Sequence, residues 1–91
     1  MNKERRKELS KAIKELEAAK EKIESAKDIV ECCKDEEQEA YDNLPESVQE
    51  GEKGDTMQDN IDSLDEAFYD FDDVPDTIDE AIEKIQEVID R

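Results

Sequence analysis

The residues that could do chemistry in this sequence are carboxylates, which are concentrated in FYDFDDVPDTIDEAI, residues 68–82. This segment holds six acidic residues and no basic one, with Pro75 at its centre. Clustered carboxylates can bind a cation, carry out acid–base catalysis, or present a negative surface to a basic partner. The choice depends on whether the segment is a metal-binding loop, a disordered tail or part of a helix.

The residue types disfavour a metal site and catalysis. DFDDVP, residues 70–75, lacks the glycine and the ligand spacing of a calcium loop. The chain has no histidine, and its only cysteines are the neighbours Cys32 and Cys33, so a zinc site lacks ligands. No nucleophile stands at a recognisable spacing from a base. We predict no catalytic residue, no metal and no cofactor.

The two cysteines are expected to be reduced. Adjacent residues of a helix point about 100° apart, so an unstrained bridge between them is ruled out. A redox-sensing or dimer-linking role for Cys32 is the alternative. No stretch approaches the roughly 20 apolar residues of a membrane span, and MNKERRKELSK does not lead into a signal-peptide core. The expected location is the cytoplasm, without membrane contact.

Charge is abundant and unevenly distributed. The net charge is −17, with 47% charged and 34% hydrophobic residues. Residues 1–34 carry ten basic and eight acidic side chains, whereas residues 35–91 carry three and 22. Such an acidic surface repels nucleic acid and anionic lipid. We therefore expect that the protein does not bind nucleic acid directly and that its partner is a basic protein.

Helical periodicity extends over most of the chain. Residues 3–42 contain no glycine or proline and form the first expected helix. Two seven-residue series define its expected seam, with one polar exception at Glu37. The large series is Leu9, Leu16, Ile23, Val30, Glu37 and Leu44, and the small series is Ala12, Ala19, Ala26, Cys33 and Ala40.

The second expected helix covers residues 56–90. Its two series are Ile61, Phe68, Pro75, Ile82 and Ile89, and Met57, Leu64, Phe71, Ile78 and Ile85. Because the repeat keeps its phase through Pro75, we predict a kinked helix with a break near residues 73–75, or a restart capped by Asp73. Residues 43–55 form the expected turn, with Gly51 and Gly54 in it and Asp55 or Thr56 capping the second helix.

The predicted fold class is all-α: one domain, residues 1–91, forming an antiparallel two-helix hairpin that resembles a coiled coil. Folding the arms together places Lys20, Lys27 and Lys34 opposite Asp79, Asp72 and Asp65, respectively. A lone hairpin buries little apolar surface, so we expect a homodimer that forms a four-helix assembly.

One outer face of the second arm is the candidate site. Its residues follow one another at steps of three or four, which places them on a single face of a helix. We call them the acidic ridge, and they are Asp59, Asp62, Glu66, Tyr69, Asp73, Asp76, Glu80, Glu83 and Glu87. We expect the ridge to bind a basic partner, with Tyr69 as an apolar anchor. A solvated face that only keeps the protein dispersed is the alternative.

The stretches DEEQEAYDNLPESVQEGEKG and MQDNIDSLDEA, residues 35–67, resemble small acidic helical proteins of phage and prophage genomes that share a YDNLPES-type core. The resemblance implies a phage accessory protein acting in the host cytoplasm, such as an inhibitor of a nuclease or a defence system. With the ridge, it predicts a non-enzymatic inhibitor that blocks a basic nucleic-acid-binding protein, as a possible DNA mimic. The alternatives are a structural coiled-coil oligomerisation module and an oligomer that holds small anions through Lys3, Arg5, Arg6 and Lys7.

Overall fold

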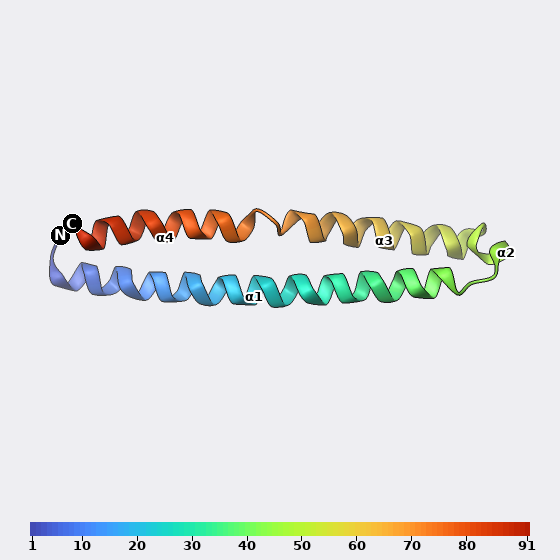
Figure 1. The fold of residues 1–91 in the computed structure, drawn as a ribbon, viewed down its shortest axis with the longest axis horizontal. Coiled ribbons are helices and arrows are strands. Elements are labelled where there is room, and N and C mark those ends of the chain that lie inside the picture. Colours follow the sequence, from blue (N-terminus) through green and yellow to red (C-terminus); the bar gives the residue numbers. More distant parts are fainter. The chain divides into compact units, whose positions relative to one another are not determined.

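The computed structural model describes the whole chain, Met1–Arg91, and every regular element in it is an α-helix (Figure 1). The helices are α1 (Lys3–Asp42), α2 (Glu46–Gln49), α3 (Glu52–Asp70) and α4 (Val74–Asp90). They hold 88% of the residues, so the predicted all-α fold class is confirmed. The chain divides into two compact units, of which unit 1 comprises Met1–Ser25 and Asp72–Arg91 and unit 2 comprises Ala26–Phe71.

In unit 2 the second part of α1 runs antiparallel to α3, and α2 joins them (Figure 1). Pro45 disfavours helical backbone at the residue before it, and α1 ends at Asp42. The carbonyl of Pro45 then accepts the N–H groups of Val48 and Gln49 at 2.9 and 3.0 Å. The carbonyl of Tyr41, in the last turn of α1, accepts the N–H of Leu44 at 3.0 Å and the side-chain amide of Gln49 at 2.9 Å.

The start of α3 differs from the expected one. The helix begins at Glu52 with Gly51 at the N-cap position, so Asp55 and Thr56 lie inside it and cap nothing. Gly54 is buried, and a Cβ there would lie 1.9 Å from the carbonyl oxygen of Gln49. No residue of the chain has a positive φ. Gly54 therefore serves the close approach of α2 to α3 and not a change of chain direction.

In unit 1 the first part of α1 lies beside α4, and the two chain ends are close together (Figure 1). The side-chain oxygen of Asn2 accepts the N–H of Arg5 at 2.8 Å and so caps α1. α4 begins at Val74, with Pro75 in its first turn, where no intrahelical N–H is needed. Asp73 occupies the N-cap position without a side-chain capping bond; its carbonyl accepts the N–H and the hydroxyl of Thr77, both at 3.1 Å.

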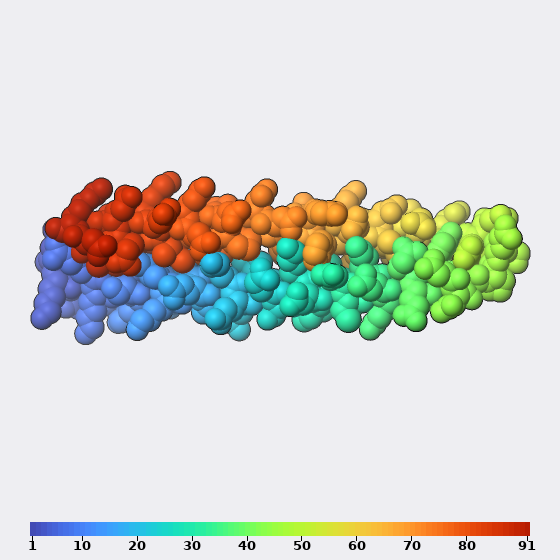
Figure 2. Space-filling view, in the orientation of Figure 1, coloured from blue at the N-terminus to red at the C-terminus, as the bar shows by residue number.

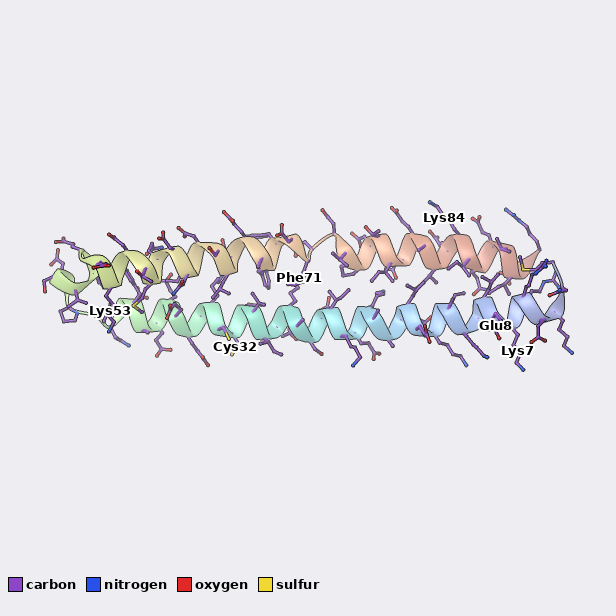
Figure 3. All side chains as sticks on the ribbon, turned by 180° about the vertical axis from the view of Figure 1, so that it is seen from behind. Lys7, Glu8, Cys32, Lys53, Phe71 and Lys84 are labelled. Atoms are coloured by element: carbon purple, nitrogen blue, oxygen red, sulfur yellow. The ribbon has the colours of Figure 1, made fainter.

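The apolar contacts of each unit are thin. Ile13 in unit 1 and Ile61 in unit 2 are the only buried hydrophobic side chains, and none in the chain is fully buried. Side chains of α1 and α4 meet along unit 1 in Figure 2. In unit 2, Phe71 points from the end of α3 toward α1 (Figure 3).

The expected small series of α1 is half-buried in unit 1, at Ala12 and Ala19, but not in unit 2. There Ala26, Cys33 and Ala40 are exposed, contrary to the expectation. The second contact series instead follows the large one by four residues, and its members are all buried or half-buried: Arg6, Ile13, Lys20, Lys27, Lys34 and Tyr41. Long lysine stems cover more apolar surface than alanine while their ammonium groups reach solvent, which explains the shift.

Two of the three expected lysine–aspartate pairs are salt bridges, one within each unit. The Nζ atom of Lys20 lies 2.6 Å from Asp79 Oδ1 in unit 1, and that of Lys34 lies 3.0 Å from Asp65 Oδ1 in unit 2. The ammonium of Lys27 lies 4.7 Å from the ring centre of Phe68. The charge pattern therefore identified the correct alignment of the arms within each unit.

These pairs predict a loss of stability at alkaline pH. The hydrogen bond to Asp79 raises the pKa of Lys20, and that to Asp65 raises the pKa of Lys34. Below the pKa of an unfolded lysine, about 10.5, each pair contributes its full stabilisation of the fold. This contribution is lost as the pH rises through the higher pKa of the folded state. We expect the Tm of the wild type, followed by circular dichroism, to fall more steeply above this pH than that of Lys20→Met/Lys34→Met.

The control for this experiment is Lys22→Met, at an exposed position without a salt bridge. It should keep the wild-type slope. Equal slopes in the wild type and the double variant would show that the two pairs do not contribute to stability.

Candidate functional site

All nine residues of the acidic ridge are exposed. Unit 2 carries Asp59, Asp62, Glu66 and Tyr69 on α3, and unit 1 carries Asp73, Asp76, Glu80, Glu83 and Glu87 at the start of α4 and along it. Within each unit, spacing by three and four residues brings the side chains onto one helical face. The structure therefore assembles two acidic faces, and the continuity of the ridge from one to the other stays a prediction.

The ridge carboxylates differ from the acids that face α1. Asp65 and Asp79 pair with lysines, whereas no carboxylate of the ridge forms a salt bridge. α3 holds seven acidic residues and one lysine, and α4 holds six and one. Like charges at three- or four-residue spacing destabilise a helix by about 0.2–0.5 kcal/mol per pair. Both helices thus carry a negative surface that their own fold does not neutralise.

Tyr69 is available as an apolar contact on the α3 face. Its side chain is 62% exposed, and its ring meets Phe68 edge-on with centroids 5.8 Å apart. Phe68 in turn is covered by the ammonium groups of Lys27 and Lys34, at 4.7 and 5.8 Å from its ring centre. Tyr69 therefore stands beside carboxylates with most of its surface open to a partner.

Both cysteines are free thiols, and both are exposed. The negative charge of Glu36, followed by desolvation, raises the pKa of Cys32, whose Sγ lies 3.9 Å from Glu36 Oε1. Because the thiolate is the reactive form, this environment slows reaction at Cys32. In Figure 3 the Cys32 side chain points away from α3.

The possible metal ligands and the basic segment near the N-terminus do not form a binding site. No group of three or more His, Cys, Asp or Glu side chains is placed to hold a metal ion. In the basic segment, Lys3, Arg5 and Lys7 are exposed, and the Nε atom of Arg6 is buried without a hydrogen-bond partner.

The sequence did not predict a groove in unit 2. Its volume is about 370 Å³, and its lining residues are Cys33, Glu37, Asn60, Ser63 and Leu64. The side-chain amide of Asn60 donates to Glu37 Oε2 at 2.9 Å. The polar exception at Glu37 in an otherwise apolar series was the only sequence signal for this feature.

No protein-family model matches the sequence, and comparison with curated proteins and with solved structures finds no similar protein. None of the helices is long and apolar enough to cross a membrane.

Proposed function

We propose that this chain is a non-enzymatic, acidic binding protein that docks on a basic nucleic-acid-binding protein and blocks its nucleic-acid site. The single observation that carries the proposal is the contrast among its carboxylates. Those facing α1 are paired with lysines, and those of the acidic ridge are exposed and form no salt bridge. Such a surface provides complementary potential for a basic groove, and Tyr69 supplies apolar contact.

The partner class follows from the charge. A basic protein that binds nucleic acid has a groove suited to closely spaced negative charges, which the two acidic faces offer. The resemblance to small phage proteins adds that the partner is a host or defence protein in the cytoplasm of an infected cell.

The proposal includes the expected homodimer. The net charge of −5 along the 17 residues of α4 amounts to about one charge per 5 Å of helix, against about one per 1.7 Å of duplex DNA. One copy is therefore a dilute DNA mimic, with about a third of the charge density of DNA, and two copies side by side would reach about two thirds of it.

The test uses a basic, sequence-independent bacterial DNA-binding protein on a fluorescent DNA duplex. At low salt, the wild-type chain should displace the duplex from the DNA-binding protein, and the fluorescence anisotropy of the duplex should fall. This displacement should weaken as the salt concentration rises. The variant Asp73→Asn/Asp76→Asn/Glu80→Gln should be at least about tenfold weaker, because it removes three charges of one face.

The matched control is Glu21→Gln/Glu24→Gln/Asp28→Asn, three exposed acids of α1 with the same spacing and the same change of charge. This control variant should displace the duplex as well as the wild type does. If both triple variants lose the same activity, net charge alone acts and the ridge is a solvated face; if the wild type releases no DNA, blocking is wrong.

A structural oligomerisation module is the second candidate function. It is supported by the thin apolar contacts of both units, which leave side chains such as Val74 and Val88 only half-buried. In that case neither triple variant would change function, whereas substitutions on the apolar surface would.

A further inference from the structure

Tyr69 carries the one aromatic ring of unit 2 that is open to a partner. Its side chain is 62% exposed, whereas the other three aromatic residues of the chain are half-buried. The ring of Phe68 has the ammonium groups of Lys27 and Lys34 over it, at 4.7 and 5.8 Å from its centre. No cation of the chain lies over the ring of Tyr69, which meets Phe68 edge-on. The chain thus covers one ring with its own cations and leaves the neighbouring ring uncovered.

Tyr69 stands at the end of an acidic face that extends along α3. The face holds six exposed carboxylates, spaced by three or four residues: Glu52, Asp55, Asp59, Asp62, Glu66 and Asp70. None of them forms a salt bridge. The only base of α3 is Lys53, which lies in the first turn, about 24 Å along the helix from Tyr69. The negative charge beside Tyr69 is therefore unopposed within α3.

The position of Tyr69 along α3 also favours a cation. Tyr69 lies in the last turn of this helix, which ends at Asp70 and has no basic residue there. The C-terminal end of a helix carries a partial negative charge from the helix dipole and attracts cations. Glu66 precedes Tyr69 by three residues, so it lies beside Tyr69 on the helix surface. An open ring, a carboxylate and the negative end of a helix therefore meet at one place.

We propose that Tyr69 and Glu66 bind an arginine side chain of the basic partner. A guanidinium group is planar, so it can lie flat on the ring of Tyr69 while its N–H groups donate to the carboxylate of Glu66. The ammonium group of lysine is a compact, strongly hydrated charge and gains less at such a site. The partner is therefore a protein that presents arginine on its nucleic-acid surface, where the same arginine contacts a phosphate.

This inference rests on the proposed function, because it takes the basic partner from there and adds which basic residue is selected. The two proposals can still fail separately. Displacement of DNA depends on the charge of the acidic ridge, so a partner with lysines alone would satisfy it. The preference for arginine depends on the ring of Tyr69.

The test compares two fluorescent, alanine-based peptides that differ only in their basic residues, which are all arginine in one and all lysine in the other. The peptides have the same charge and similar helix propensity, so binding of the full chain at low salt isolates the chemistry of the cation. Followed by anisotropy, the arginine peptide should bind about three- to tenfold more tightly than the lysine peptide. Tyr69→Leu should bring the two affinities to within about twofold of each other.

Two further variants separate the ring from its hydroxyl group and from general charge. Tyr69→Phe should keep the preference for arginine, because it keeps the ring. Glu66→Gln should reduce the preference, because it removes the carboxylate beside the ring. The matched control is Glu39→Gln, which should leave the preference unchanged. Glu39 is an exposed acid of α1 in unit 2 with no aromatic residue three or four positions away.

Circular dichroism of each variant should show unchanged helix content, because all three positions are exposed. Equal binding of the two peptides to the wild type overturns the proposal and leaves the blocking function standing. A Tyr69→Leu protein that keeps the preference, or a Tyr69→Phe protein that loses it, also overturns the role of the ring. If neither peptide binds, docking on the acidic face is wrong as well, and both proposals fail.

Discussion

Replacing Ile61 by alanine is expected to lower the free energy of unfolding by about 2–4 kcal/mol, the largest loss for any single truncation in unit 2. Ile61 is 7% exposed and is the one buried hydrophobic side chain of that unit. Its removal leaves a void where few other apolar contacts remain to compensate. Urea denaturation followed by circular dichroism measures the change.

Ile29→Ala is the matched control, because the same atoms are removed from an α-helix at a side chain that is 65% exposed. Its effect on monomer stability should stay within about 0.5 kcal/mol, with a slight gain from the helix propensity of alanine. Dilute protein keeps any self-association out of the comparison. If the two variants lose the same stability, Ile61 is not a core residue in solution.

Replacing Gly54 by alanine should destabilise the hairpin of unit 2 by about 1–3 kcal/mol. A Cβ at this position would lie 1.9 Å from the carbonyl oxygen of Gln49 and 2.4 Å from its carbonyl carbon. Because both atoms belong to the backbone, α2 must move away from α3 to make room. The gain of about 1 kcal/mol that alanine brings to a helix offsets only part of this cost.

Gly51→Ala tests whether the effect is specific. A Cβ there would lie 3.5 Å from the carbonyl oxygen of Val48, an ordinary contact, and the backbone at φ −93° is accessible to any residue. We expect its midpoint in urea to lie between those of the wild type and of Gly54→Ala, because alanine is a poorer N-cap residue than glycine but meets no backbone atom at close range. A Gly54→Ala protein as stable as Gly51→Ala would mean that α2 is not packed on α3 as described.

The sequence predicted the helices better than the contacts between them. An uninterrupted run of helix-forming residues identified α1 from Lys3 to Asp42, and opposite charges identified the pairing of Lys20 with Asp79. The start of α3 was misplaced because glycine usually marks a turn, and the close approach that requires Gly54 depends on a neighbouring backbone. The seam of α1 was shifted because lysine was counted as surface although its stem packs.

For the candidate site, periodicity predicted which acids share a helical face and are exposed. It could not predict the groove of unit 2, because that feature arises where residues distant in sequence, such as Cys33 and Leu64, come together. Continuity of the acidic ridge depends on two units and not on the period of one helix, so it stays a prediction.

The bond between Asn60 and Glu37 has a consequence for how unit 2 reaches its fold. Sequences with seven-residue repeats can pair after sliding by one repeat, and a polar pair that bridges the two helices beside the seam favours one alignment over the others. A slide that lengthens the turn would place Glu37 opposite Ala67 and leave its carboxylate without a donor. A slide that shortens it would consume the residues of α2 and break the bond between Gln49 and Tyr41. Both misaligned hairpins therefore lose a bond that the native alignment makes, so the turn and the polar pair together specify one register.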